Sequence, residues 1–273
     1  MPADLHVHTT FSDGSDSPEE IVREAKKANL KTIAITDHDV VEGIDPAIKE
    51  GKKLGVDVIP GIEFTTETPD KEIHILGYLI DYKNARLKEI LAKIQEGRRN
   101  RIYKIAEKLT KIGVKLDPAR VLELAKDGSA GRPHVARVLL ETGIVKSVKE
   151  AFDRYLDSRG PAYVPHYKLF PNEAIKLILD VKGVPVLAHP AISKCDDMIP
   201  DLVSFGLMGI EAYYPGYLGQ NTKYYTGLAK KYNLLVTGGS DYHGKSNTKD
   251  IGLGGVPVSD ELVDILIEAG KRP

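Results

Sequence analysis

Short apolar segments alternate with longer amphipathic ones along most of this chain. The short segments are rich in Val, Ile and Leu and are bounded by turn residues, a pattern typical of β-strands. Seven such strands are predicted, at Asp4–Val7, Thr32–Thr36, Asp57–Pro60, Ile73–Leu79, Val184–Ala188, Met208–Ala212 and Leu234–Thr237. Alternation of strands with helices favours a parallel sheet or barrel covered by helices, and seven strands favour the barrel.

Apolar residues at three- and four-residue spacing predict helices between most of these strands. The first helix has a clear start, because Ser17 can cap it, Pro18 suits the first helical position, and Glu19 and Glu20 follow in the first turn. Further helices are expected at Ile44–Leu54, Asn172–Val181, Asp197–Phe205, Gln220–Tyr232 and Asp260–Ala269.

Residues 83–168 interrupt the alternation, because the pattern there is helical throughout. A long helix is predicted from Asn84 to about Lys111, followed by shorter ones at Pro118–Ala125, Pro133–Leu140 and Val148–Tyr155. We therefore expect an α/β barrel made of residues 1–82 and 169–273, with an all-helical insertion domain at residues 83–168.

The charge of the chain is divided between these two parts. The 273 residues include 38 Lys and Arg against 39 Asp and Glu, a net charge of −1. Residues 83–168 hold 20 basic and 10 acidic residues, a net of +10, so the remainder carries −11. Acidic side chains suit cations and a basic surface suits an anionic ligand, which hints at a metal enzyme acting on a phosphate-bearing substrate. Solvated helical faces would give the same composition.

The cysteine count and the apolar segments limit the setting in which the protein works. Cys195 has no partner in the chain, which fits a reducing compartment and leaves His and carboxylates to hold any metal. The longest apolar stretches, such as Ile75–Ile80, are far shorter than the roughly 20 residues of a membrane span. The N-terminus shows no targeting pattern, so we expect a cytoplasmic protein with no membrane partner.

Histidines and carboxylates recur where the predicted strands end. His6 and His8 lie two apart in a strand, so both side chains leave the same face and can bind one cation. Any one such residue is more often an ordinary core or rim residue, but six strand ends carry at least one. The candidate metal ligands are His6, His8, Asp13, His38, Glu63, His74, His189, Asp241 and His243.

Nine ligands of this kind are enough for two or three divalent ions, with Glu63 bridging. Mixed nitrogen and oxygen donors suit zinc, manganese or iron and disfavour calcium or magnesium alone. Such a cluster suits phosphate ester hydrolysis, although two-metal amidases and deaminases use similar ligands. The basic insertion favours phosphate.

The insertion also contains a candidate phosphate site. Pro133 is expected at the first position of a helix, which puts Arg132 and His134 beside a helix N-terminus, where anions bind. A capped surface helix with an exposed arginine is the alternative. Lys168 could add a phosphate contact, and the tyrosines of Tyr163–Lys168 could stack on a base, unless this segment is an ordinary hinge.

Taken in order, these motifs resemble the PHP (polymerase and histidinol phosphatase) domain family over nearly the whole chain. The matching segments are His6-Val7-His8 with Asp13, Thr36–Asp39, Gly61-Ile62-Glu63, His74, Ala188-His189-Pro190 and Gly239–His243. The resemblance implies a distorted seven-stranded (β/α) barrel with a trinuclear site of manganese, iron or zinc at its mouth. By that analogy the three ligand sets would be His6, His8, Glu63 and Asp241; Glu63, His74 and His189; and Asp13, His38 and His243.

Within that family, the insertion with its Gly131–His134 segment resembles small bacterial phosphoesterases. These include 3',5'-nucleotide bisphosphatases and enzymes that trim short oligoribonucleotides from the 5' end. Several relatives have His where this chain has Asp13, which would weaken the third ion or leave a two-metal enzyme.

The leading hypothesis is therefore a metal-dependent phosphoesterase that releases phosphate from a nucleotide or a short oligonucleotide through a metal-bound hydroxide. His189, another imidazole or a metal-bound water would protonate the leaving group. The alternatives are a histidinol-phosphate phosphatase and, from another class, a non-catalytic nucleic-acid-binding module with a structural metal site. No stable binding to duplex DNA is expected.

Overall fold

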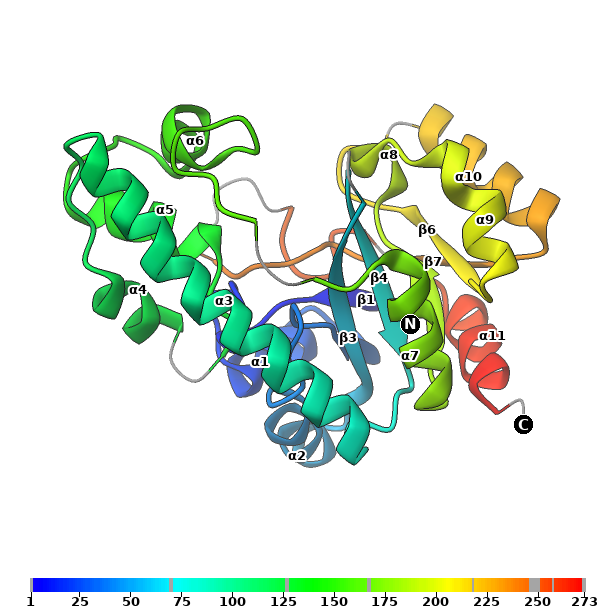
Figure 1. Ribbon diagram of the computed structural model, residues 1–273. Coiled ribbons are helices and arrows are strands. Elements are labelled where there is room, and N and C mark those ends of the chain that lie inside the picture. The colour runs from blue at the N-terminus through cyan, green and yellow to red at the C-terminus, as the bar shows by residue number, and fades with distance from the viewer. Residues whose placement is uncertain are drawn as a thin grey trace.

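The seven predicted strands form one sheet that curves into a nearly closed barrel, seen at the centre of the computed structural model (Figure 1). The structure describes residues 2–68, 71–125, 128–165, 168–217, 219–245, 251–256 and 258–271. The strands pair in chain order and are β1 (Ala3–Val7), β2 (Thr32–Ile35), β3 (Asp57–Glu67), β4 (Glu72–Tyr78), β5 (Val184–Leu187), β6 (Gly209–Tyr213) and β7 (Leu235–Gly238). The residues after β7 close the ring, because Val7 forms a parallel bridge with Tyr242.

The alternation of strands and helices predicts a parallel barrel, but one strand of the barrel is antiparallel. Strand β4 runs antiparallel to both β3 and β5, while the other neighbouring strands are parallel. Only four residues separate β3 from β4, which is too short for the helical crossover that parallel strands need. The start of β4 therefore lies at the same end of the barrel as the carboxyl ends of the parallel strands.

The third strand is also longer than predicted. The expected end near Pro60 is wrong, because β3 continues to Glu67 and pairs with β4 from Gly61 opposite Tyr78 to Glu67 opposite Glu72. Gly61 was taken as part of a strand end, but a Cβ there would lie only 2.9 Å from the carbonyl oxygen of Ile35. The glycine allows close strand approach rather than a turn, so it does not end the strand.

Six helices follow the strands much as the apolar spacing predicted. They are α1 (Pro18–Lys27), α2 (Ile44–Leu54), α7 (Pro171–Asp180), α9 (Ile199–Ser204), α10 (Gly219–Tyr232) and α11 (Asp260–Gly270). The predicted start of α1 is confirmed, because Ser17 and Glu20 form a reciprocal capping box. The expected helix at 197–205 is interrupted, and two short turns, α8 (Pro190–Ser193) and η2 (Asp196–Met198), precede α9.

Residues 85–164, here called the helical segment, pack on both the barrel and one another. They form α3 (Ala85–Lys111), α4 (Pro118–Ala125), α5 (Arg132–Glu141), α6 (Val148–Ala151) and the π-helical turn η1 (Phe152–Leu156). The first half of α3 buries Leu87 and Leu91 in the barrel core, whereas Ile105 and Leu109 join a second apolar cluster with α4 to η1. In Figure 1, α4, α5 and α6 accordingly stand apart from α9, α10 and α11.

The division into two domains at residues 83 and 168 stays a prediction. No helix in the parts of the chain that the structure describes is long and apolar enough to cross a membrane.

Candidate metal centre

The nine predicted metal ligands lie together at the mouth of the barrel. His6 and His8 come from the end of β1, His38 from the turn after β2, and His189, Asp241 and His243 follow β5 and β7. Glu63 and His74 lie inside β3 and β4, and His74 reaches this mouth because β4 runs in the opposite direction. Four groups of these side chains have ligand atoms within 4.8 Å of one another: His8, Asp13, His38 and His243; His6, His189 and Asp241; His6, His8 and Glu63; and His38, Glu63 and His74.

Glu63 occupies the centre of the cluster. Its Oε2 lies 3.0 Å from His38 Nδ1 and 3.3 Å from His8 Nε2. Its Oε1 lies 2.9 Å from His74 Nδ1 and 3.0 Å from His189 Nε2. Local structure holds this residue, because its main chain exchanges hydrogen bonds with Asp37 and Asp39. A carboxylate that faces imidazoles with both oxygens is placed to bridge two ions.

Several buried atoms of the cluster lack a hydrogen-bond partner among the described residues. They are His6 Nε2, His8 Nε2, Asp13 Oδ1, Glu63 Oε2 and His189 Nδ1. Leaving one buried polar atom unpaired costs about 1–3 kcal/mol, so five such atoms facing one another need a compensating ligand. Divalent cations satisfy imidazole nitrogens and carboxylate oxygens together, and the residues present therefore fit metal ions.

The ligand sets implied by the resemblance are only partly the groups seen here. Asp13, His38 and His243 do form a group, and His8 joins it. His74, however, groups with His38 and Glu63, and Asp241 groups with His6 and His189. The number of ions and the ligands of each remain predictions.

The electrostatics show how strongly the cluster demands positive charge. Burial opposes ionisation of Glu63, but attraction to His38, His74 and His6 outweighs it and holds the pKa of the carboxyl well below its usual value. Burial likewise opposes protonation of His74, yet Glu63 and Glu72 raise its pKa to about 10. Protons on the imidazoles thus offset the carboxylates where cations would otherwise do so.

Carboxylates beneath the cluster hold the candidate ligands in place. The buried Glu211 on β6 lies 2.9 Å from His6 Nδ1 and accepts a hydrogen bond of 2.8 Å from the main-chain N–H of His189. Glu211 is not among the site residues predicted from the sequence, although an acidic residue in an apolar strand is a signal that it has a buried partner. Carboxylates that bind ligand imidazoles from behind orient them and raise their basicity.

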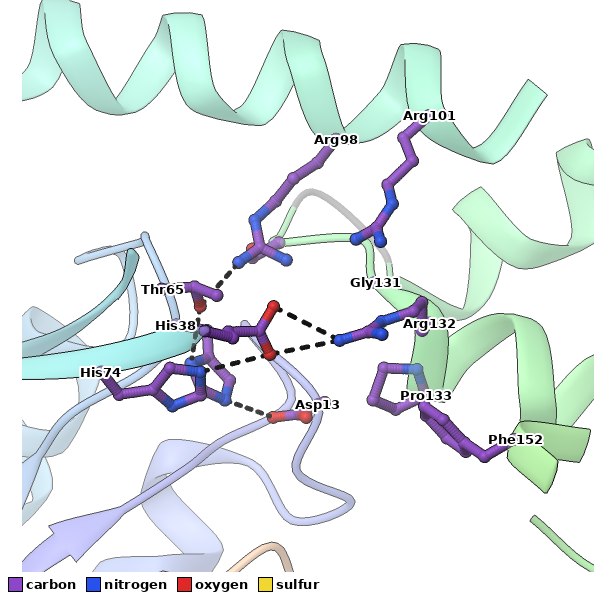
Figure 2. Close-up of a pocket in the computed structure, with 12 residues that line it drawn as sticks. Asp13, His38, Thr65, His74, Arg98, Arg101, Gly131, Arg132, Pro133 and Phe152 are labelled. Atoms are coloured by element: carbon purple, nitrogen blue, oxygen red, sulfur yellow. Dashed lines mark hydrogen bonds and ion pairs between the residues drawn. The ribbon is translucent and has the colours of Figure 1, made fainter. Parts of the chain in front are cut away.

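A cavity of about 160 Å³ separates the metal centre from the helical segment (Figure 2). Arg98 and Arg101 reach down into it from α3, and Arg132 reaches in from α5. Its lining residues are Asp13, His38, Thr65, Glu72, His74, Arg98, Arg101, Ser129, Gly131, Arg132, Pro133 and Phe152. The cavity therefore has candidate metal ligands on one side and three guanidinium groups on the other.

Only one of the three predicted phosphate contacts lines this cavity. Arg132 does so, and its Nη2 donates to Glu72 at 3.1 Å. His134 is buried behind the lining, and its Nδ1 accepts from the N–H of Gly131 at 3.2 Å. The Lys168 side chain is only 3% exposed and forms ion pairs with Glu72 and Glu67. Neither His134 nor Lys168 is thus placed at the cavity surface.

Of the two tyrosines predicted to stack on a base, one lies within the described residues. Tyr163 donates its hydroxyl to Glu67 at 3.0 Å, and its ring lies beneath the guanidinium of Arg132. His166 and Tyr167 lie outside the described residues.

Sequence reasoning missed Arg98 and Arg101, although a signal for them exists. Leu87, Leu91 and Ile94 set the phase of the buried face of α3, and continuing the same spacing leads to positions 98 and 101. Both arginines are indeed buried. A charged residue on the apolar phase of a helix indicates a buried partner or ligand.

Comparison with known proteins relates the chain to metal-dependent phosphoesterases. The sequence profile described as the PHP domain matches residues 4–161. A phosphoribosyl 1,2-cyclic phosphate 1,2-diphosphodiesterase of Eggerthella lenta is 32% identical, over 90% of this chain and 95% of that protein. The 5'-3' exoribonuclease Rnm of Escherichia coli is 39% identical, over 68% of this chain and 64% of its own.

Two further matches agree in fold and class. A 3',5'-nucleoside bisphosphate phosphatase of Chromobacterium violaceum is 28% identical, over 88% of this chain and 86% of that protein. A crystal structure from Bifidobacterium adolescentis, assigned as a metal-dependent phosphoesterase, superposes with a TM-score of 0.91 at 29% identity, covering 100% of this chain and 99% of its own.

Proposed function

Because the chain belongs to the PHP domain family, we propose that it is a metal-dependent phosphoesterase of nucleotides. Its substrate class is a nucleoside 3',5'-bisphosphate or the 5' end of a short oligoribonucleotide. One observation carries the proposal: the cavity has candidate metal ligands on one side and buried, unpaired hydrogen-bond donors on the other.

The unpaired donors belong to Arg101 and Ser129. Arg101 donates its Nε to the carbonyl of Val164 at 2.6 Å, but its buried Nη2 has no hydrogen-bond partner among the described residues. Burial and repulsion from Arg132 and Arg98 lower the pKa of Arg101 to about 10, so the group stays charged at neutral pH. Ser129 Oγ is buried and unpaired within the same described set. A phosphate oxygen in the cavity would satisfy both donors.

Arg132 and Arg98 take different roles in this proposal. Arg132 is paired with Glu72, whose carboxylate stands where a substrate anion would bind the guanidinium. Arg98 has its donors occupied by Asp39, Thr65 and the carbonyl of Ala130, so it supports the site rather than contacting phosphate.

The nine residues of the candidate metal centre would hold two or three ions of manganese, iron or zinc. Such ions supply an activated water and offset the negative charge that develops on the phosphate. The protein's own residues bind the phosphate, exclude water beneath α3 and orient the imidazoles through Glu211. His189, another imidazole of the cluster or a water held by the ions would protonate the leaving oxygen.

The names of the relatives support this substrate class more than the alternatives. The Chromobacterium violaceum enzyme is named for 3',5'-nucleoside bisphosphates and the Escherichia coli enzyme for 5'-3' exoribonuclease activity. The substrates in both names contain a phosphate next to a ribose. The site offers guanidinium groups and candidate metal ligands for that phosphate. No contact in the described residues favours histidinol phosphate.

A phosphate-release panel tests the proposal. Purified protein loaded with manganese is assayed on nucleoside 3',5'-bisphosphates, nucleoside monophosphates, short 5'-phosphorylated RNA and histidinol phosphate. We expect release from bisphosphate or RNA, loss after chelation and recovery on adding metal. Comparable hydrolysis of histidinol phosphate would instead assign the protein as a phosphatase of that substrate. Salt-sensitive oligonucleotide binding without turnover under any divalent ion would favour the binding module.

A further inference from the structure

The loop that carries Asp13 is held by the helical segment. The main-chain N–H of Ser129 donates to the carbonyl of Phe11 at 2.7 Å. Arg137, on α5, donates its Nη2 to the carbonyl of Asp13 itself at 2.5 Å. The carbonyls of Phe11 and Asp13 in the loop thus receive hydrogen bonds from residues 129–137.

Packing confirms that this contact is close. A Cβ on Gly128 would lie 1.9 Å from the carbonyl oxygen of Phe11, so the two backbones touch directly. The Asp13 loop is therefore fixed from outside the barrel.

The helical segment reaches His38 by a second route. Arg98 forms a buried ion pair with Asp39, the residue after His38, and its Nη2 donates to Thr65 Oγ1 at 3.0 Å. Thr65 Oγ1 lies 3.3 Å from His38 Nδ1. Asp13 and His38 belong to the same candidate metal group.

The rest of the cluster is supported from the barrel. Glu211 on β6 holds His6 and His189, and Asp37 and Asp39, in the turn after β2, hold the main chain of Glu63. The metal centre therefore has two parts. His6 and His189 are held by the barrel, whereas Asp13 and His38, next to the cavity, also depend on contacts with α3 and α5.

We propose that Arg137 is a positioning residue which fixes Asp13 and so sets the metal affinity of the Asp13–His38–His243 group. Asp13 Oδ1 lies 3.3 Å from His243 Nε2 and 4.0 Å from His38 Nε2. An aspartate side chain is short, so a shift of its main chain moves this oxygen directly. The Glu63-centred groups have no such dependence on α5. This inference rests on the proposed metal centre.

The experiment counts bound metal rather than turnover. Full-length wild-type, Arg137→Ala, Arg137→Lys and Asp13→Asn proteins are stripped of metal and refilled with manganese. Stepwise affinities are measured by calorimetry, and bound metal is measured by elemental analysis after gel filtration. Arg154→Ala is the matched control, because Arg154 lies in the same helical segment and pairs with Glu150 at the surface. Melting of the metal-free proteins shows whether each variant folds.

We expect Arg137→Ala to weaken one binding step by about tenfold, the scale seen when a residue supporting a metal ligand is lost. Asp13→Asn should affect the same step, and the double variant should add little. Arg137→Lys, which keeps a donor, should recover part of the affinity, and Arg154→Ala should match wild type.

Equal weakening of every step, or no change in any step, overturns the proposal. So does a loss in Arg137→Ala at a step that Asp13→Asn leaves intact. Because no substrate is present, failure of the phosphoesterase assignment would leave this result standing.

Discussion

The mouth of the barrel and the helical segment present opposite chemistry to one cavity. The barrel contributes imidazoles and carboxylates whose buried atoms lack hydrogen-bond partners among the described residues. The helical segment contributes Arg98, Arg101 and Arg132 on the facing side (Figure 2). Each side has buried polar atoms without a hydrogen-bond partner among the described residues, and metal ions together with a phosphate would satisfy them. Three of the 20 basic residues between 83 and 168 thus face the metal centre.

The two regions also differ in how they keep their charges. In the barrel, imidazoles and carboxylates converge, and cations between them would bind both kinds of group. In the helical segment, Arg98 is neutralised by Asp39 of the barrel, whereas the Nη2 of Arg101 has no hydrogen-bond partner within the described part of the chain. One arginine therefore joins the two regions, while its neighbour one turn away is available for a ligand.

The largest effect is expected from Glu63→Gln, which removes the central charge of the barrel side. An amide cannot bridge two cations as a carboxylate does, so phosphate release should fall by about a thousandfold or more. Metal content measured by elemental analysis should fall with it. Retention of both metal and activity would show that Glu63 is not the centre of the site.

Arg98→Ala removes the buried ion pair between the two regions and should destabilise the fold. Removing one partner of a buried ion pair costs about 3–5 kcal/mol, because the other charge stays buried. Denaturant unfolding of the metal-free protein measures this change. The double variant Arg98→Met/Asp39→Leu should recover much of the stability. An equal loss of stability in the single and the double variant would mean that lost packing, not the unpaired charge, causes it.

Arg101→Ala should weaken substrate binding with a smaller effect on folding. Loss of a charge-assisted hydrogen bond, about 1.5–3 kcal/mol, corresponds to roughly a 10- to 100-fold fall in kcat/KM for a phosphate monoester. The exposed neighbour Arg99→Ala is the control and should change little. Metal content should remain at the wild-type level. A loss of metal would mean that Arg101 supports the metal centre rather than binding the phosphate.

The smallest effect concerns the pH dependence of stability through His134. Burial lowers the pKa of His134 to about 4, against about 6.5 when unfolded, so the unfolded chain binds more protons between these values. The contribution of His134 to the free energy of unfolding is therefore highest above pH 6.5, where His134 is neutral in both states, and it falls as the pH drops toward 4. By pH 5.5 it has fallen by about 1 kcal/mol.

His134→Asn keeps an acceptor for Gly131 but does not titrate. Unfolding of metal-free wild type and variant at pH 7.5 and 5.5 should therefore show their stability difference narrowing at the lower pH. A constant difference would mean that the pKa of His134 is the same in the folded and unfolded chain, and a widening one would mean that the fold stabilises its protonated form.

Local patterns predicted most elements because their signals are local. The bounds of α2 and α4 agree with the sequence to the residue, since apolar spacing and helix starts lie within the elements themselves. The predicted end of β3 was wrong because Pro60 and Gly61 resemble a turn, whereas Gly61 pairs with Tyr78 of β4, seventeen residues further along the chain. Pairing of distant strands carries no local signature.

The candidate site was likewise predictable where its signals are local, and not where distant contacts decide. Six strand ends with His, Asp or Glu implied a cluster, and the structure brings all nine side chains together. The helix start at Arg132 was also correctly located, within a residue. Whether a cation there reaches a cavity or an internal partner depends on tertiary contacts, and Lys168 and His134 have internal partners.

By itself, the sequence determined the seven strands, the helical interruption and the set of residues that converge at the barrel mouth, because parallel strands end at one side of a barrel whatever surrounds them. Only the tertiary structure decided that β4 runs antiparallel, that β3 continues to Glu67, and that Arg98 pairs with Asp39 while Arg101 Nη2 has no hydrogen-bond partner among the described residues. These depend on which distant groups come within about 3 Å of each other, and hydrogen bonds and ion pairs are sensitive to that distance.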